Sequence, residues 1–524
     1  PNFIGFMNTP ILKAKKGNQT LIFYNDGEYD HWKDTHSITG WNIKYYKGLG
    51  TSTGKEFKEY FTYKKIVYFH HEGEKSKDDI DKVFNKKRSD DRKLWLSGYS
   101  RKSYLDTESD QVSYSNFIDR ELIHFSKYDC DRSIPNLMDG LKISLRKILF
   151  SAFKKNLKNE IKVAQFSGYV SEHSGYHHGE ASLNAAIVGL AQDFVGSNNI
   201  NLFQPYGQFG TRLQGGKDSA SERYIFTQLN PITRMIYKQD DDAILRYLDD
   251  DGSPVEPIHY CPIIPMILVN GSKGIGTGFS TDIMPYNPSE IIDYLKERLS
   301  ISDNSCEAPI QNINPYYQGF IGSITEIDDQ SGKYLIKGLY KKTAAKKFHM
   351  TELPIGTWTD DYKQFLEGLM DKQSKGFNGI VKEYNDMSTD TVVDIEIILT
   401  QEVVAIEAQE CSIEHINGLE KMFKLYTTHS TTNMHMFDHD EKLKKYDNVY
   451  EIMEDFYHVR LNYYDIRKKH ILNNLNIIQQ VLSNKAKYIT EILNDTLDLR
   501  KKSKQEIIDM LIEKGYDRDD SDGY

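Results

Sequence analysis

The residues best suited to chemistry lie between about residues 126 and 265, where Gly, His, Arg and Tyr are densest. Within this stretch Arg223 and Tyr224 follow the run from Gly215 to Glu222, which predicts a flexible turn. A phenol has an ordinary pKa of about 10 and is a weak nucleophile at neutral pH, so attack on phosphate needs a nearby cation or metal. Arg223 supplies such a cation and makes Tyr224 a candidate nucleophile. In a chain with 35 tyrosines, spacing alone favours a packing role instead.

A second cluster, Tyr176-His177-His178-Gly179-Glu180, places two imidazoles beside a carboxylate. Both kinds of group bind divalent metals, but adjacent histidines rarely point at one ion. Hydrogen bonds to phosphate, or a structural role, are therefore favoured over a metal site.

Two glycine-rich segments resemble nucleotide-binding motifs without completing them. In the run from Gly271 to Gly278, Phe279 stands where a dinucleotide motif needs its last glycine. Gly216-Lys217 lacks the upstream glycine and the following Ser or Thr of a P-loop. No nucleotide site is predicted at either segment. Ile275, among small residues, is instead suited to enter a DNA groove, where an apolar wedge unstacks a base step and bends the duplex.

The composition predicts a soluble protein of several domains. A chain of 524 residues exceeds the size at which single cores stop growing, about 250 to 300 residues. With 39% hydrophobic and 27% charged residues, it holds no apolar run near the roughly 20 residues that a membrane span needs. The cysteines lie far apart and form no CxxC pair, which favours a reducing compartment over a zinc module or disulfides: Cys130, Cys261, Cys306 and Cys411.

The charge pattern is divided along the chain. A formal net charge of -10 argues mildly against a nucleic-acid partner, because phosphate binding rests on Lys and Arg. Between Lys142 and Lys162, however, basic residues outnumber the single acid Glu160, while residues 517–522 are mostly acidic. The basic stretch permits a DNA surface, although a solvated helix face would look the same.

The sequence patterns along the chain predict the helices and strands that position these residues. Together they indicate a multidomain fold with α/β and α parts. Residues 1–75 mix short strands with a helix near 53–63, and residues 76–125 look like a charged helical linker. Helices with glycine turns fill residues 126–265, and alternating apolar residues predict strands within residues 266–430. In residues 431–524, a coiled-coil seam predicts a protruding arm, with a helix packed on a core as the alternative: Ile471, Leu475, Ile478, Leu482, Ile489 and Ile492.

Several segments, in order along nearly the whole chain, resemble the eukaryotic-type (type IIA) DNA topoisomerase II family in its breakage-reunion region. Tyr45 to Ser52 looks like the family's YYKGLGTS segment, and the stretch from Arg132 to Lys147 resembles its RSIP and DG.K..RK signatures. Further similar segments follow, namely YHHGE at 176–180, FVGSNNI at 194–200, FGTR at 209–212, GGKD at 215–218, RY at 223–224 and FYHVRL at 456–461.

The resemblance implies a particular domain order. Residues 1–75 would be the C-terminal part of a TOPRIM α/β domain, joined by the helical linker 76–125 to a winged-helix domain at 126–265. An α/β tower domain would occupy residues 266–430. Residues 431–524 would form the first part of a long antiparallel coiled-coil arm that leads to a distal dimer contact.

The resemblance also implies roles for single residues. Tyr224 would join a 5′ DNA phosphate covalently, with Arg223 stabilising the transition state and His178 assisting. The other residues that match the family's DNA-binding positions are Lys47, Arg132, Lys142, Lys147, His177, Lys217 and the wedge residue Ile275.

The cofactors and partners implied are Mg²⁺, ATP, double-stranded DNA and a second identical subunit, with no membrane. The family's acidic EGDSA and DQDQDGSH motifs are absent from this sequence, so the Mg²⁺ ligands and the ATPase domain are expected upstream of Pro1. Ile143-Ser144, in place of the family's proline and glycine, marks a divergent member.

A hypothesis from another class is a DNA-bending architectural protein that wedges Ile275 into a duplex without cutting it. Such a protein would not need Arg223 beside Tyr224. Richness in Lys, Asn, Ile and Tyr suggests an AT-biased genome, such as that of a large DNA virus. The compartment would then be the host cytoplasm, or the nucleus for a cellular protein.

Overall fold

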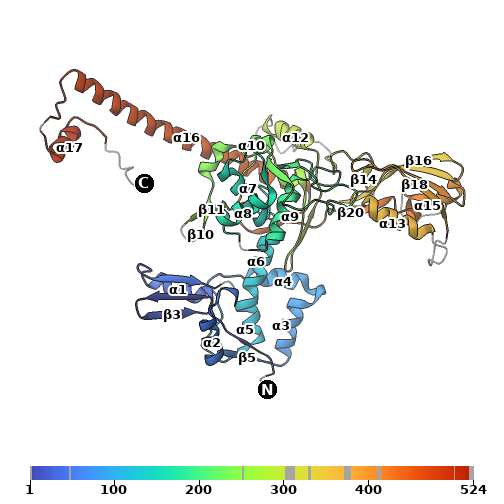
Figure 1. The fold of residues 1–524 in the computed structure, drawn as a ribbon, viewed down its shortest axis with the longest axis horizontal. Coiled ribbons are helices and arrows are strands. Elements are labelled where there is room, and N and C mark those ends of the chain that lie inside the picture. The colour runs from blue at the N-terminus through green and yellow to red at the C-terminus, as the bar shows by residue number, and fades with distance from the viewer. Residues whose placement is uncertain are drawn as a thin grey trace.

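A computed structural model describes residues 3–46, 49–176, 178–250, 253–300, 313–327, 332–370, 379–409, 415–500 and 502–517. Figure 1 shows an N-terminal body below a central body, a tower projecting to one side and a helical arm projecting to the other. The fold is mixed α/β. None of the helices that the structure describes combines the length and apolar character needed to cross a bilayer.

The N-terminal body contains two small sheets. The antiparallel sheet β3-β2-β4 packs an aromatic core against the first helix, which buries Tyr29 and Trp32. In the second sheet, β5 pairs with β1 antiparallel and with β6 parallel. The elements are β1 (Gly5–Met7), β2 (Leu12–Lys16), β3 (Gln19–Phe23), α1 (Asp26–Thr35), β4 (Asn42–Tyr45), α2 (Gly54–Tyr63), β5 (Ile66–His70), α3 (Glu74–Phe84), α4 (Ser89–Ser97) and β6 (Gln111–Ser113).

The pairing of β5 with β6 differs from the predicted boundary at residue 75. β6 lies within the stretch 76–125 that the sequence predicts as a helical linker, yet it completes a sheet begun by residues 5–7 and 66–70. Val67, Leu105 and Val112 share one buried cluster. The stretch is thus part of the N-terminal body rather than a free connection.

Helix α2 begins with a capping box that makes the N-terminal body sensitive to acid. Burial alone would raise the pKa of Glu56, but hydrogen bonds from Thr53, Tyr46 and Lys44 outweigh it and lower the pKa from 4.5 to about 2. A carboxyl with a lowered folded-state pKa stabilises the fold fully above its unfolded pKa. Stability from Glu56 is therefore present above pH 4.5 and lost as the pH falls toward 2.

We expect Glu56→Gln to lower the melting temperature near neutral pH and to match wild type progressively better in acid. Thermal unfolding measured from about pH 7 down to about pH 3 checks this convergence. Glu59→Gln is the control, because Glu59 is half exposed and reaches only Lys13, at 3.6 Å. A gap between wild type and Glu56→Gln that widens in acid would contradict the assignment.

A composite helix joins the N-terminal body to the central body. It runs through α5 (Tyr114–Phe117), a π-helical segment (Ile118–Leu122) and α6 (Ile123–Ser133). Figure 1 shows α5 within the lower body and α6 reaching the central one. The C-terminal turns of α6 are thereby held against the central body.

The central body is a helical core with a small antiparallel sheet of order β7-β9-β8. This body contains a buried ion pair between Arg146 and Asp139. Arg146 Nε and Nη2 donate to the two oxygens of Asp139, at 2.7 and 3.0 Å. The elements are α7 (Ile143–Lys155), β7 (Ile161–Lys162), α8 (Val163–Ser174), α9 (Glu180–Ala191), β8 (Phe203–Tyr206), β9 (Phe226–Leu229), α10 (Pro231–Ile236), β10 (Tyr247–Asp250), β11 (Ser253–Pro257), α11 (Met266–Asn270) and α12 (Pro288–Ser300).

The tower has its own apolar core, supplied by alternate residues of strands such as β17 and β19. A buried ion pair between Arg212 and Glu352 fixes it to the central body. The elements are β14 (Ser323–Glu326), β15 (Lys333–Lys337), β16 (Leu339–Ala344), β17 (Lys347–Glu352), α13 (Thr359–Met370), β18 (Val381–Asp386), β19 (Ile395–Leu399), α14 (Val403–Glu407), α15 (Gly418–Met422) and β20 (Tyr426–Ser430).

A four-stranded sheet crosses the predicted limits of the tower. Its order is β12-β13-β21-β22, which joins β12 (Ser272–Ile275) and β13 (Ser280–Ile283) to β21 (Met434–Phe437) and β22 (Leu443–Tyr446). Residues 266–294 also pack in the central core. The sequence predicts residues 266–430 as one tower domain. The first part of this range packs in the core of the central body instead.

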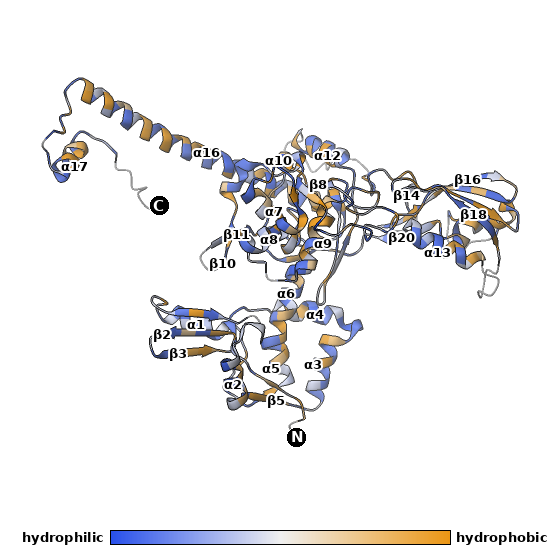
Figure 2. Ribbon diagram, viewed as in Figure 1, coloured by the Kyte–Doolittle hydropathy of each residue, from blue (hydrophilic) through white to orange (hydrophobic). Residues whose placement is uncertain are grey.

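The arm is the single helix α16 (Val449–Leu493), which leaves the central body as Figure 1 shows. Buried Arg460 anchors its base by donating to Asp241 and to the Cys261 carbonyl oxygen, both at 2.8 Å. Apolar residues recur along the rest of the helix in Figure 2, and those of the predicted seam are partly exposed. From Ile471 to Leu482 this face stays exposed in the described part of the chain, so the coiled coil remains a prediction.

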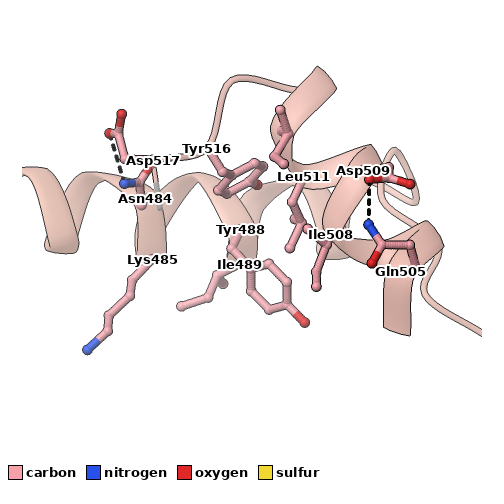
Figure 3. Close-up of a pocket in the computed structure, with 11 residues that line it drawn as sticks. Asn484, Lys485, Tyr488, Ile489, Gln505, Ile508, Asp509, Leu511, Tyr516 and Asp517 are labelled. Atoms are coloured by element: carbon pink, nitrogen blue, oxygen red, sulfur yellow. Dashed lines mark hydrogen bonds between the residues drawn. The ribbon is translucent and has the colours of Figure 1, made fainter. Parts of the chain in front are cut away.

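Beyond the arm, α17 (Lys504–Glu513) turns back toward the outer end of α16. Figure 3 shows the hollow between the two helices, about 760 Å³ in volume, with Tyr488 and Ile489 on one side and Ile508 and Leu511 on the other. Asn484 donates to Asp517 across its rim, at 3.1 Å.

Candidate nucleic-acid interface

A cleft of about 600 Å³ brings together five residues predicted from distant parts of the sequence. Its walls come from the end of α6, the start of α7, the segment before α9 and the hairpin β12–β13. The predicted residues that line it are Arg132, Lys142, Lys147, His178 and Ile275.

Three basic side chains of the cleft differ in how far their charge is already paired. Arg132 is half exposed and donates to Asp129 Oδ1 at 2.9 Å. Lys142 donates to the Lys273 carbonyl oxygen at 2.7 Å, and burial lowers its pKa. It precedes α7, whose N-terminal amides add positive potential for an anion. Arg132 and Lys142 are therefore the stronger candidates for phosphate contact.

Lys147 is placed differently from the sequence expectation of a DNA-facing lysine. Its side chain is 15% exposed and forms an ion pair with the buried Glu256 at 2.8 Å. It also donates to the Ser174 carbonyl oxygen at 2.5 Å. The charge of Lys147 is thus largely compensated inside the protein, and its position suits holding the cleft wall.

His178 lines the same cleft and contacts two tyrosine rings. Its Nε2 is 2.6 Å from the hydroxyl of Tyr128 on α6, and the Tyr176 ring packs near perpendicular to it, with 5.4 Å between ring centroids. Arg132 lies over the other ring, 5.7 Å from the Tyr128 centroid. Sequence reasoning missed Tyr128, although it stands four residues before Arg132, a spacing that puts both on one helix face.

Ile275 projects into the cleft from the end of β12, with 76% of its surface exposed. Such exposure is unfavourable for an aliphatic side chain in water, and burial between bases would remove it. The hairpin that carries Ile275 closes with a hydrogen bond from Gly276 N to Phe279 O, at 2.8 Å. Ile275 is therefore carried by a short hairpin whose turn is closed by a backbone hydrogen bond.

The glycines around Ile275 serve protein packing, which the sequence pattern did not reveal. A Cβ at Gly274 would lie 2.0 Å from the Ser133 carbonyl oxygen, and one at Gly276 would lie 3.0 Å from Cys130 Cα. Thr277 on the hairpin also donates to Asp129 Oδ2 at 3.1 Å. The hairpin is thus fastened to α6, and the one carboxylate of Asp129 binds both the hairpin and Arg132.

Tyr224 lies on the turn before β9, with 74% of its surface exposed, and does not line the cleft. Arg223 beside it is exposed as well. Backbone hydrogen bonds hold both flanks of the turn, since Glu222 O accepts from Ala164 N and Ile225 O accepts from Val163 N, each at 3.1 Å. The backbone of the turn is held on both sides, and the exposed Tyr224 and Arg223 follow one another on it. A phenol next to a cation in the sequence is compatible with attack on a phosphate.

The glycine run before Tyr224 is packed, contrary to the expected flexible turn. Gly215 and Gly216 have positive φ values of 61° and 82°, which favour glycine. A Cβ at Gly215 would lie 2.2 Å from the Trp358 ring. Asp218 accepts from the amide and the hydroxyl of Thr211, at 2.9 and 2.5 Å. The tower and the loop itself therefore brace the segment that carries Tyr224.

The remaining predicted residues lie elsewhere. Lys217 lines a separate hollow beside α13, whose other charged residues are Asp360, Asp361, Lys363 and Glu367. Lys47 and His177 lie outside the described residues, and their predicted DNA contacts stay predictions.

Comparisons with known proteins agree along the chain. The family model for DNA gyrase/topoisomerase IV matches residues 132–518, and that of the C-terminal associated domain of TOPRIM matches residues 7–130. DNA topoisomerase 2 of Arabidopsis thaliana is 46% identical over 98% of this chain, and DNA topoisomerase 2-alpha of Rattus norvegicus is 43% identical over 98%. The chain spans about a third of these relatives, 34% of each.

A solved structure shows the same fold. The crystal structure of the Plasmodium falciparum topoisomerase II DNA-binding, cleavage and re-ligation domain superposes with a TM-score of 0.80 at 43% identity. The match covers 98% of this chain and 68% of that one.

Proposed function

This chain belongs to the eukaryotic-type DNA topoisomerase II family, in its breakage-reunion region, and from that premise we propose that it cuts and rejoins double-stranded DNA. The observation that carries the proposal is the exposed Tyr224 beside Arg223 on a braced turn, on the same body as the basic cleft. A second duplex would pass through the opened one before resealing.

The proposed chemistry is a reversible transesterification. Tyr224 Oη forms a bond to a DNA phosphorus atom and gives up its proton, while the bond from that phosphorus to the 3′ oxygen of the preceding nucleotide breaks. The 3′ oxygen takes up a proton, and the 5′ phosphate stays on the tyrosine. Arg223 stabilises the added negative charge of the pentavalent phosphate, as a pre-placed cation does. Attack by the 3′ hydroxyl reverses each step, so sealing needs no energy source at this site.

The cleft and the tyrosine have separate tasks in this proposal. Arg132 and Lys142 neutralise backbone phosphates, while Ile275 unstacks a base step. Each chain carries one Tyr224, so cutting both strands of a duplex requires two copies. We therefore propose a homodimer as the working form.

Mg²⁺ and ATP are proposed as cofactors of the enzyme that contains this chain, on the basis of family membership. The part of the chain that the structure describes offers no group of three or more His, Cys, Asp or Glu side chains able to hold a metal. The residues described do not fit a metal centre, and no step above is assigned to one. A viral source, the compartment, and the TOPRIM, winged-helix and tower boundaries also remain predictions.

The test of the function is covalent capture. The enzyme that contains this chain is mixed with duplex DNA labelled at its 3′ ends and with Mg²⁺, then denatured and digested with protease. A labelled phosphotyrosyl peptide that contains Tyr224 is the expected product. DNA bent but never joined to protein would favour the architectural hypothesis, which the relatives named as topoisomerases do not support.

We expect Ile275→Ala to reduce DNA bending more than DNA affinity. Removing the wedge leaves the base step stacked, while the phosphate contacts of Arg132 and Lys142 persist. Energy transfer between dyes at the ends of a short duplex should fall toward the value for free DNA, with affinity changed by less than about tenfold. Ile321→Ala is a matched control, since Ile321 is 60% exposed but lies outside the cleft. Bending equal to wild type would remove Ile275 from this role.

A further inference from the structure

We propose that Tyr128 is a positioning residue that fixes the tautomer of His178, so that Nδ1 carries a hydrogen toward the DNA. The inference rests on the proposed function, because it specifies how one residue of the cleft meets a phosphate. Tyr128 itself would not touch the reacting atoms.

The geometry gives the Tyr128 hydroxyl a single partner on the imidazole. Its Oη lies 2.6 Å from Nε2 of His178, and the two rings lie 6.1 Å apart at an interplanar angle of 32°. Tyr128 is held in turn by Arg132 above its ring, and Asp129 holds Arg132. The Tyr176 ring also contacts His178, with the two planes near perpendicular. The imidazole therefore touches two tyrosines, and its Nε2 is engaged by Tyr128.

Engagement of Nε2 decides what Nδ1 can do. A neutral imidazole has one N–H and one bare nitrogen, and the hydrogen bond made by one nitrogen sets the state of the other. When the phenol donates to Nε2, the hydrogen of neutral His178 must sit on Nδ1. When His178 is protonated, Nε2–H donates to the phenol oxygen and Nδ1 still carries a hydrogen. As long as the phenol donates to the neutral ring, which is the arrangement proposed here, Nδ1 is a donor to phosphate in both protonation states.

Without the phenol, the neutral ring is free to keep its hydrogen on Nε2. Nδ1 would then be a bare acceptor, which repels a phosphate oxygen and becomes a donor only when the ring is protonated. The described groups around His178 are mostly cations and phenols: Arg132, Lys142, Lys147, Tyr128 and Tyr176, with Asp129 paired to Arg132 and Glu256 to Lys147. The exposed Glu180 follows on the first turn of α9. These groups are unchanged in Tyr128→Phe, so a new pH dependence would come from the imidazole.

The experiment measures the rate of covalent adduct formation in the enzyme that contains this chain, for wild type and Tyr128→Phe, across about pH 5.5 to 8.5. We expect Tyr128→Phe to be slower by about 10- to 100-fold at the alkaline end, as for lost support of a functional histidine. The deficit should shrink toward the acidic end of this range, because a protonated imidazole carries a hydrogen on both nitrogens whether or not the phenol is present. A ratio of the two rates that is constant across this range would overturn the proposal.

Two further variants separate positioning from simple loss of structure. In a His178→Ala background, Tyr128→Phe should cause no additional slowing, and a full additional loss would show that the phenol acts independently. Tyr169→Phe is the matched control, because Tyr169 stacks on His173 at 3.9 Å outside the cleft. Its rate relative to wild type should not depend on pH.

The two proposals can fail separately. If wild type forms no adduct, the proposed function fails, while the ¹⁵N shifts of His178 in the isolated chain still report which nitrogen carries the hydrogen. Nδ1–H in wild type and Nε2–H in Tyr128→Phe would uphold the tautomer assignment. The same tautomer in both proteins would overturn it.

Discussion

Tyr224→Phe should abolish the covalent protein–DNA adduct while leaving noncovalent DNA binding intact. The change removes one oxygen atom, and without it no bond to phosphorus can form. Losing the nucleophile of a covalent mechanism costs several orders of magnitude in rate, on the order of 10⁶ in a well-studied case. Because Tyr224 is 74% exposed, stability should change by less than about 0.5 kcal/mol.

The measurement pairs adduct formation with an equilibrium binding assay on the same duplex. Tyr63→Phe is a suitable control, since Tyr63 is 82% exposed and lies on α2, in the N-terminal body. That variant should form the adduct at the wild-type rate. Adduct formation or supercoil relaxation that survives Tyr224→Phe would exclude Tyr224 as the nucleophile.

Asp139→Asn should destabilise the central body by about 3 to 5 kcal/mol, the usual cost of breaking a buried ion pair from one side. Asp139 is 0% and Arg146 6% exposed, so the substitution leaves an uncompensated buried guanidinium. The carboxylate also accepts from the amides of Leu141 and Tyr260, at 3.0 and 2.9 Å. One residue thus ties the start of α7 to the segment after β11.

Hydrogen exchange of the α7 amides measures this loss locally, without requiring the whole chain to unfold together. Protection of these amides should fall, while that of the tower strands β17 and β19 should not. Asp90→Asn is the control, because Asp90 pairs with Lys93 on the surface with 89% of its side chain exposed. Unchanged protection in α7 would show that the pair contributes little to the fold.

Sequence patterns predicted the features that depend on local order. The helical spacing of the seam residues within 431–524 predicted the arm, which is the 45-residue helix α16. The alternation within residues 266–430 predicted strands, of which β19 is one. The family resemblance, carried by segments such as FGTR and RY, is confirmed by the comparisons. These features could be predicted because each pattern is contained in a short stretch of the sequence.

Features that depend on distant partners were not predictable in the same way. Lys147 looks available for DNA until Glu256, far along the chain, is seen to pair with it. The small residues beside Ile275 look suited to enter a DNA groove, but Gly274 and Gly276 pack against the backbone of α6. Likewise, the boundary at residue 75 gives no sign that β6 will return to pair with β5. Each case is set by tertiary packing.

The fastening of the Ile275 hairpin to α6 has a consequence for how DNA sites are chosen. Gly274 and Gly276 pack closely against the backbone of α6, which leaves the hairpin little room to move. If Ile275 enters the duplex as proposed, most of the distortion would therefore fall on the DNA. The energy of that distortion depends on the base step, because pyrimidine–purine steps unstack and kink more easily than others. Preference among sites would then follow the stiffness of the double helix at the wedge, even where no side chain reads a base edge.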